Sequence, residues 1–331
     1  MSRIINFGYV NAYGLLAMSP FGFIGHTCSL VTFSSKTLRT TSTGFLFILL
    51  TLCDILYLSI MVPELMQELG TEILRSEVLC RSRPFIFNTS TVISAWLLVL
   101  IAIDRLIRVR FPFQQAQLCT RKVAACMTAV VCICAAVFTY HVLQPEFTFT
   151  NPITSRCGPN RTNPTSYSIF YYNTWPILQL IFTYVLPSIC MSLFLIGVYS
   201  KMRQQQTVAV ASLRREKQQR QMLILMISSV VWFIICTLPY GTFRIILQRI
   251  PSTSTTSLVS NILNILRNMN YCFNFYLHCL TSQLFRKTFI QQLKRFAIYC
   301  KRQHGHENTA VYPLTTIIRP RALQTTNGQN H

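Results

Sequence analysis

Apolar stretches of about 20 residues recur along this 331-residue chain and constrain its fold more than any other feature. A helix of about 20 apolar residues is long enough to cross the hydrocarbon core of a bilayer. We predict seven such spans, at about 11–34, 43–66, 84–107, 122–143, 174–199, 221–247 and 258–280. Because 51% of the residues are hydrophobic and only 12% are charged, the composition excludes an ordinary soluble domain. We therefore expect an all-α membrane protein built as a bundle of seven transmembrane helices.

Lysine and arginine gather in alternate connecting segments, whereas Glu68, Glu72, Glu77 and Glu146 lie in the segments between. Membrane proteins keep an excess of Lys and Arg on the cytoplasmic side, so the pattern predicts an N-terminus outside the cell. The net charge of +21 is then mostly a cytoplasmic surface that faces anionic membrane lipids. Nucleic-acid binding, the other common interpretation of a basic protein, is not expected of a chain with seven membrane spans.

Two charged residues, Asp104 and Arg105, stand where the third apolar run ends. Burying a carboxylate and a guanidinium there is costly unless the two are paired or face a protein interior. Neighbouring side chains on a helix point about 100° apart, so Asp104 could hold the head of Arg105 until a moving helix released it. The alternative is that an acid and a base simply mark the membrane interface.

The pattern Asp-Arg-x-x-x-Val-x-x-Pro, from Asp104 to Pro112, resembles the rhodopsin-like G-protein-coupled receptors. The resemblance extends over about residues 10–296. The positions that share its register are Asp54, Cys80, Asp104, Arg105, Val109, Pro112, Pro187, Pro239, Asn274 and Phe285. It implies a receptor that couples an extracellular ligand to a heterotrimeric G protein. Pro239 would be the hinge of the sixth helix, because proline removes a helical hydrogen bond.

Among the positions that depart from the family pattern, four bear on switching. Leu106 replaces an aromatic residue, Thr237 replaces the tryptophan of the sixth span, Phe275 replaces a proline and His278 replaces a tyrosine. The resemblance does not say how these departures affect switching.

Further roles follow from the resemblance alone. It implies a disulfide between Cys80 and Cys157, and a polar network of Asp54 with Asn270 and Asn274 in which Asp54 coordinates sodium or water. Asn160-Arg161-Thr162 is a glycosylation sequon on the expected outer side. Asn88-Thr89-Ser90 also fits that pattern, but we expect it to lie inside the third helix.

The ligand class is approached by exclusion. Phe87 stands where amine receptors of the family carry an aspartate, and the retinal-binding lysine is missing near Arg267 and Asn268. A peptide ligand is favoured by the long second outer loop and scattered outer charges, and NFYLHCLTSQLFR is similar to invertebrate FMRFamide-like neuropeptide receptors. A chemosensory receptor for small molecules is the alternative within the family. A transporter or channel is the alternative outside it.

Charges inside the spans suggest a pocket. Arg267 and Glu64 fall at comparable heights in helices that should be neighbours, so we predict that they pair across the pocket floor. Alternatively, Arg267 contacts backbone carbonyls or water and Glu64 points outward. The predicted pocket residues are Glu64, Phe87, Asn88, Thr91, Tyr240, Arg244, Asn264 and Arg267.

The ends of the chain complete the prediction. We expect residues 1–10 outside the cell, a receptor domain over 11–298 and a disordered cytoplasmic tail over 299–331. The domain includes an amphipathic helix at 282–298 that lies on the inner leaflet, and Cys300 beyond it is a candidate for palmitoylation. We find no catalytic constellation and no metal-ligand spacing, so an enzyme is not expected.

Overall fold

The computed structural model describes residues 7–68, 76–151, 156–160, 163–206, 213–251 and 253–307. The chain divides into two compact units, Met1–Phe289 and Ile290–His331, and the helical bundle is the first of them. Within the described residues, six stretches are helical, long and apolar enough to cross a membrane. They are Asn11–Phe33, Ser42–Pro63, Glu77–Arg110, Arg121–Leu143, Ser166–Gln204 and Leu223–Ile246. The predicted all-α membrane bundle is confirmed.

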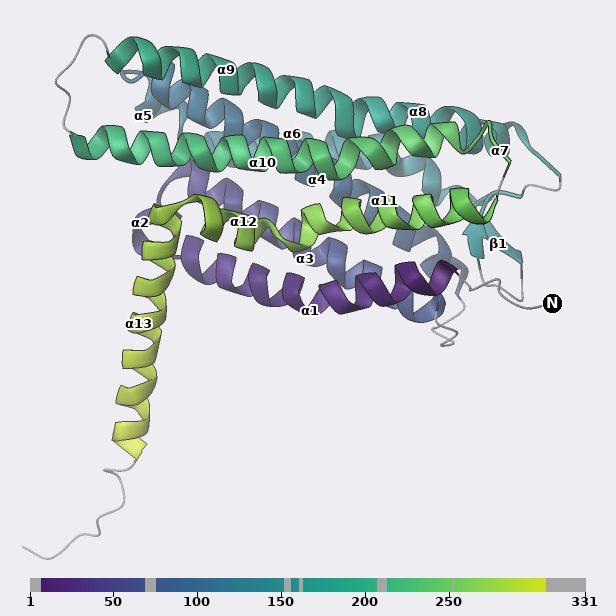
Figure 1. The fold of residues 1–331 in the computed structure, drawn as a ribbon, viewed down its shortest axis with the longest axis horizontal. Helices are drawn as coiled ribbons and strands as arrows, with labels where there is room; N and C mark the ends of the chain where they lie inside the picture. The colour runs from purple at the N-terminus through teal and green to yellow at the C-terminus, as the bar shows by residue number, and fades with distance from the viewer. Residues whose placement is uncertain are drawn as a thin grey trace, which may run out of the picture. The chain divides into compact units, whose positions relative to one another are not determined.

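The elements follow the chain in this order: α1 (Phe7–Phe33), α2 (Lys36–Arg39), α3 (Ser42–Glu68), α4 (Glu77–Arg110), α5 (Gln115–Leu118), α6 (Arg121–Thr139), the 3₁₀ turn η1 (Tyr140–Leu143), β1 (Thr148–Asn151), β2 (Arg156–Gly158), α7 (Ser166–Ile169), the π-helical η2 (Phe170–Thr174), α8 (Trp175–Gln179), the π-helical η3 (Leu180–Val185), α9 (Leu186–Gln206), α10 (Leu213–Ile246), α11 (Ser254–Cys272), α12 (Asn274–Thr281) and α13 (Gln283–Glu307). Figure 1 shows the long helices of the first unit running side by side.

Helix α4 is the centre of the bundle. It packs against α3, α6 and α9, whereas α1 lies between α3 and α11, and α10 lies between α11 and α9. The most apolar window of the α4 span is 61% buried, against 22% for the span that begins at Arg121. Residues on α4 are therefore the ones that can reach several other helices at once.

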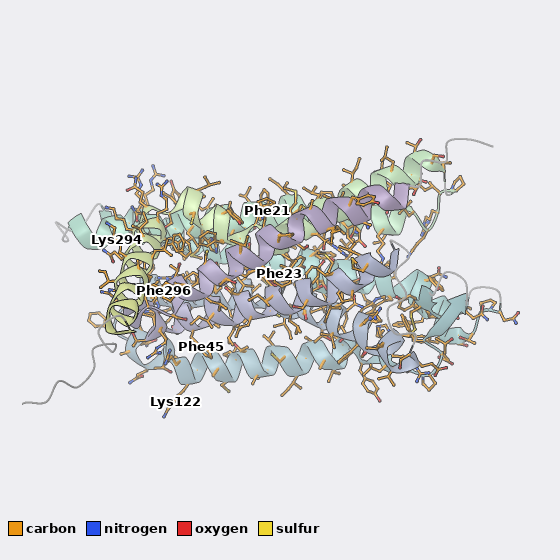
Figure 2. The ribbon with its side chains drawn as sticks, turned by 90° about the horizontal axis from the view of Figure 1, so that it is seen from below. Phe21, Phe23, Phe45, Lys122, Lys294 and Phe296 are labelled. Carbon is orange, nitrogen blue, oxygen red and sulfur yellow. A yellow bond between two sulfur atoms is a disulfide. The ribbon has the colours of Figure 1, made fainter. Side chains whose placement is uncertain are left out.

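The outer faces of the helices carry apolar side chains. On α6, Met127, Val130, Ile133 and Val137 are exposed at spacings of three and four residues, which place them on one face. Phe21 of α1 is exposed in the same way (Figure 2). Such faces are expected of helices that are surrounded by lipid, because no aqueous solvent opposes their exposure.

The seventh predicted span, 258–280, is interrupted. Helix α11 ends at Cys272 and α12 begins at Asn274, with Phe273 between them at φ −108° and ψ 9°. This region is not among the six apolar stretches, since it contains several asparagines and Arg267. The last membrane helix is therefore built from a long polar-faced segment and a short apolar one.

Other boundaries also differ from the prediction. The fifth helical stretch begins at Ser166 rather than near residue 174, and α13 runs to Glu307 rather than ending at 298. Residues 299–307, which we had expected in a disordered tail, are thus helical, and 308–331 lie outside the described residues. The loop after the fourth helix also forms a small antiparallel sheet, in which Thr148 pairs with Gly158 and Phe149 with Cys157.

Candidate functional site

A disulfide joins Cys80 at the start of α4 to Cys157 in β2, with a Cα–Cα distance of 5.6 Å. The pairing implied by the family resemblance is confirmed. Cys80 is buried with Val142 and Phe147, so the bond lies against a small apolar cluster. We call this end of the bundle the disulfide end.

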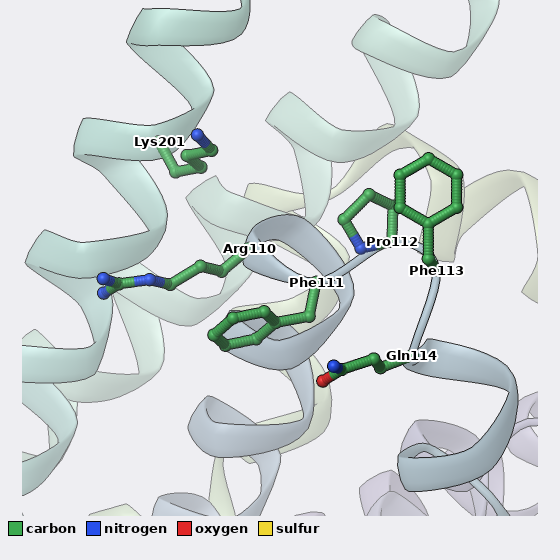
Figure 3. Close-up of a pocket in the computed structure, with 6 residues that line it drawn as sticks. All are labelled: Arg110, Phe111, Pro112, Phe113, Gln114 and Lys201. Atoms are coloured by element: carbon green, nitrogen blue, oxygen red, sulfur yellow. The ribbon is translucent and has the colours of Figure 1, made fainter.

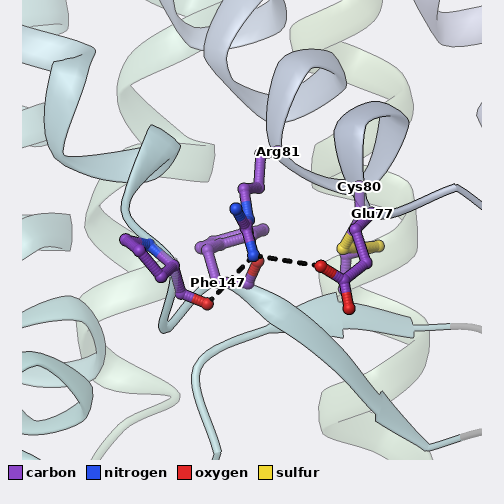
Figure 4. Close-up of a disulfide and its surroundings, with 6 residues drawn as sticks. Glu77, Cys80, Arg81 and Phe147 are labelled. Carbon is purple, nitrogen blue, oxygen red and sulfur yellow. Dashed lines mark hydrogen bonds and ion pairs between the residues drawn. A yellow bond between two sulfur atoms is a disulfide. The ribbon is translucent and has the colours of Figure 1, made fainter.

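Arg81 adds a second attachment at the disulfide end. Its Nε donates to the Phe147 carbonyl at 3.1 Å, and one terminal nitrogen reaches Glu77 at 3.3 Å and the Pro145 carbonyl at 3.3 Å (Figure 4). The sheet and the turn before it are therefore held to the first turns of α4 by covalent and polar bonds together.

Arg267 of α11 lies inside the bundle at only 6% exposure. Its guanidinium carbon stands 4.1 Å from the centroid of the Tyr240 ring and 5.3 Å from that of Phe87. Four tyrosine side chains lie near this guanidinium: Tyr57, Tyr184, Tyr240 and Tyr271. These residues come from α3, η3, α10 and α11, so the charge lies where several helices converge. We call Arg267, Phe87 and the four tyrosines the arginine cluster.

Stacked aromatic rings hold the side chains of the arginine cluster together. The ring of Tyr57 lies 4.0 Å from that of Tyr271 and 4.6 Å from that of Phe87, and its hydroxyl donates to Asn268 at 2.5 Å. Within the described residues, the Nε of Arg267 and the hydroxyl of Tyr271 are buried without a hydrogen-bond partner, whereas the Tyr184 hydroxyl interacts with the guanidinium. The cluster thus holds both a cation and unused donors.

A chain of hydrogen bonds crosses the bundle near the arginine cluster. Arg244 of α10 donates to the side-chain oxygen of Gln179 at 2.7 Å, and Gln179 donates to Asn88 of α4 at 2.9 Å. The structure therefore brings the predicted residues Arg244 and Asn88 together through Gln179. We had not identified Gln179, although a polar residue in a predicted apolar span is a usable signal.

Two other predicted pocket residues, Thr91 and Asn264, use their side chains in hydrogen bonds within or between helices. Thr91 donates to the Phe87 carbonyl of its own helix at 2.8 Å, and Asn264 donates to Asn11 of α1 at 3.0 Å. The side chain of Glu64 lies outside the described residues, so its predicted pair with Arg267 stays a prediction.

Asp54 of α3 is the centre of a second polar site. It is 1% exposed, and its two carboxylate oxygens accept hydrogen bonds from Ser94 at 2.9 Å and Asn274 at 2.8 Å. The predicted contact with Asn274 is thereby present, and Ser94 of α4 joins it. Asn270 is also buried, but it donates neither of these bonds. Helices α3, α4 and α12 are tied to one carboxylate.

Asp104 accepts more bonds than we predicted, and from other residues. Its carboxylate accepts from Ser42 and Thr43 at the start of α3, and from Arg108 at 2.9 Å. Arg108 also donates to Ser42 at 2.7 Å. Asp104 thus forms an ion pair with Arg108, one helical turn later, and its predicted restraint of Arg105 stays a prediction. Residues four apart lie on one helix face, whereas neighbours do not.

An exposed pocket lies at the same end of the bundle as Asp104. It has a volume of about 360 Å³ and is lined by Arg110, Phe111, Pro112, Phe113, Gln114 and Lys201 (Figure 3). Phe113 is 96% exposed and Phe111 is 44% exposed. Two lysine or arginine side chains and two aromatic rings thus share one surface, which the sequence pattern had not singled out.

The substituted positions Phe275 and His278 pack into a shared aromatic cluster. The Phe275 ring lies 5.8 Å from Phe285, and the His278 ring lies 5.7 Å from Phe285 and 5.4 Å from Phe47. Phe33 stacks on Phe47 at 4.8 Å. These residues fix α12 against α1, α3 and the start of α13.

Pro239 lies inside α10, which continues through it to Ile246. Thr237, at the position where the resemblance predicted a tryptophan, is fully buried and donates to the Phe233 carbonyl at 2.7 Å. Its side chain is therefore satisfied within its own helix and contributes little bulk to the interior.

Comparison with known proteins places these sites in a family. No curated protein matches the chain at a significant level. A family described as "7 transmembrane receptor (rhodopsin family)" matches residues 27–276, which is more than half of the chain. The match includes the disulfide, the Asp54 site, the Asp104 cluster and the arginine cluster. The chain belongs to the rhodopsin family of seven-transmembrane receptors.

Proposed function

We propose that this receptor binds a peptide outside the cell and activates a heterotrimeric G protein at the plasma membrane. Receptors of this family signal through G proteins, and the peptide ligand is the specific part of the proposal. In this orientation the disulfide end faces outward and the end that carries Asp104 faces the cytoplasm. The excess of lysine and arginine in the segments at the Asp104 end supports that orientation.

The observation that carries the peptide proposal is the β1–β2 pair fixed at the disulfide end. A two-stranded sheet has unpaired backbone groups along its edges, and an extended peptide can add to such an edge. The disulfide and Arg81 hold the sheet at the top of α4, the helix that also carries Asn88 and Phe87. A ligand that contacted the sheet could therefore continue toward polar groups between the helices.

The surface around Phe113 supports the proposal at the other end. An apolar side chain that is 96% exposed beside Arg110 and Lys201 is typical of a residue that is buried by a partner. We propose that the G protein covers this surface. Arg105, on the same helix, would contribute when the inner part of α10 moves outward about Pro239.

The test is activation of cells that express the receptor with promiscuous G proteins. A peptide library would include amidated Arg-Phe peptides, since the sequence is similar to FMRFamide-like receptors. We expect concentration-dependent signalling with a discrete set of peptides and none in cells that lack the receptor. Activation by small environmental molecules, with no response to any peptide, would support the chemosensory alternative and contradict this proposal.

A further inference from the structure

Arg267 is buried, and its Nε has no hydrogen-bond acceptor among the described residues. We infer that it binds an anionic group, a carboxylate, that the ligand carries into the arginine cluster. This inference rests on the proposed receptor function and makes its ligand more specific. A ligand carboxylate is not what the similarity to FMRFamide-like receptors suggests, because amidated peptides end in a neutral group.

Burial is the first step of the argument. Arg267 is only 6% exposed, and it stands between helices that we expect to cross the membrane. An uncompensated charge in such a place is costly, and buried charges in proteins are paired or hydrogen-bonded. A residue that stays charged there is expected to meet a counter-ion in some functional state.

The aromatic contacts account for only part of that requirement. Tyr240 and Phe87 offer ring faces to the cation, at 4.1 Å and 5.3 Å from the guanidinium carbon. A ring face attracts the charge but does not replace an acceptor in the plane of the N–H groups. Within the described residues, Nε is without such an acceptor. The planar fork of arginine matches the two oxygens of a carboxylate.

The tyrosines add donors that suit the same ligand group. The hydroxyls of Tyr184 and Tyr271 are buried near Arg267; within the described residues the Tyr271 hydroxyl has no hydrogen-bond partner, whereas the Tyr184 oxygen interacts with the guanidinium. A phenol can donate its O–H to a carboxylate while its oxygen accepts from a guanidinium. The cluster therefore offers a cation and two O–H donors to one acceptor-rich group.

The charges around the cluster favour an anion over a cation. Arg244 lies close enough to act on Tyr184, as Arg267 does, so two guanidinium groups share one tyrosine neighbour. The buried acid on the inner side, Asp54, is already bonded to Ser94 and Asn274. Among the described residues, a ligand with a positive group at this depth would meet two cations, whereas a carboxylate would be attracted by both.

The first measurement needs no ligand. In purified full-length receptor, Arg267→Gln should leave the melting temperature unchanged or raise it, because the variant removes a buried charge whose Nε has no acceptor among the described residues. A structural role, including a pair with Glu64, predicts a lower melting temperature. In that case the exchanged double variant, Glu64→Arg with Arg267→Glu, should regain part of the loss. A lower melting temperature of Arg267→Gln, or its partial recovery in the exchanged double variant, would overturn the inference.

The second measurement uses matched probes. One arm compares synthetic peptides that end in a free carboxylate with the same peptides amidated, and the other compares small carboxylic acids with their primary amides. We expect at least one acid to raise the melting temperature of the wild type while its amide does not. Arg267→Gln should weaken that acid at least about tenfold, as expected for a lost charge-assisted bond. Arg267→Lys should retain part of the effect.

Arg249 supplies the matched control, because it is exposed in the turn that follows α10 and carries the same charge. Arg249→Gln should respond to the acid like the wild type. No acid-specific shift in either arm, or an equal shift in Arg267→Gln, would overturn the inference. Activation by amidated peptides alone would leave the proposed peptide function standing and reject the carboxylate. A response confined to the small acids would support the carboxylate and reject the peptide.

Discussion

Arg108 and Asp104 lie one turn apart on α4 and form an ion pair at 2.9 Å, and the same carboxylate accepts bonds from the start of α3. The side chain of Asp104 is 8% exposed and that of Arg108 is 25% exposed. The pair is therefore shielded enough to matter for stability. Through the bonds from Ser42 and Thr43, Asp104 joins α3 to α4 at the end where the G protein is expected to bind.

Replacing Asp104 with Asn should raise basal signalling, because the carboxylate no longer ties α4 to Ser42 and Thr43. A hydrogen bond to a charged group contributes about 1.5–3 kcal/mol, so a lower melting temperature is expected as well. Basal second-messenger level at equal surface expression is the measurement. Arg108→Gln is the informative comparison, since it should have the same effect if this pair is the restraint. If only Asp104→Asn raises signalling, the restraint acts through another residue.

Replacing Arg105 with Ala should abolish G-protein activation and leave ligand binding largely intact. The reason is that the residue belongs to the proposed cytoplasmic surface rather than to the arginine cluster. Binding of an identified agonist and G-protein turnover would be measured on the same membranes. Wild-type turnover in this variant, at equal expression, would show that Arg105 has no part in coupling.

Replacing Cys157 with Ser should destabilise the receptor, because the disulfide closes a long loop between α4 and β2. Such bonds typically contribute about 2–4 kcal/mol. Thermal unfolding of the purified protein, with non-reducing peptide mapping of the wild type, checks the prediction. Cys119→Ser, which removes a free thiol, is the control and should unfold like the wild type. Free thiols at Cys80 and Cys157 in surface-expressed receptor would contradict it.

Cys119, in the segment between α5 and α6, should react slowly with thiol reagents at neutral pH. Burial, together with the nearby Asp104, raises the pKa of this thiol to about 11. Because the thiolate is the reactive form, the labelling rate should keep rising with pH through 9.5. An exposed cysteine introduced by Gln117→Cys, in a Cys119→Ser background, should level off near its ordinary pKa of about 8.5. Identical pH profiles for the two thiols, followed by mass spectrometry, would refute the prediction.

Sodium should stabilise the receptor through Asp54. Hard oxygen ligands suit this ion, and the carboxylate and the Ser94 hydroxyl lie within 2.9 Å of each other, with lone pairs beyond those used in the bonds. Exchanging sodium chloride for choline chloride should lower the melting temperature of the wild type. Asp54→Asn should lose this difference, and Asp104→Asn should keep it. An unchanged sodium effect in Asp54→Asn would place the ion elsewhere.

Much of the fold was predictable because membrane spans depend on local composition. Length and hydropathy located the long helices, and the register of the family pattern placed Cys80 opposite Cys157. The break at Phe273 was not predictable in the same way. The resemblance expects a proline nearby, and Phe275 in its place gives no local reason for a helix to end.

Contacts at the candidate sites depended on geometry that spacing alone does not determine. Arg108 was missed as the partner of Asp104, although the two are four residues apart, because the family pattern drew attention to Arg105. The tyrosines around Arg267 come from helices that are distant in the chain. Only the relative rotation of those helices decides that these side chains gather around one guanidinium.

The break between α11 and α12 leaves the last part of the bundle as an eight-residue helix. A helix of that length does not form by itself, because helix nucleation is costly and few backbone bonds are gained. Its persistence depends on Asn274 at one end and on the rings of Phe275 and His278 along its side. The position of α12 is therefore set by its contacts with α3 and with the start of α13. A small movement of Asp54 or Phe285 would be transmitted to it directly.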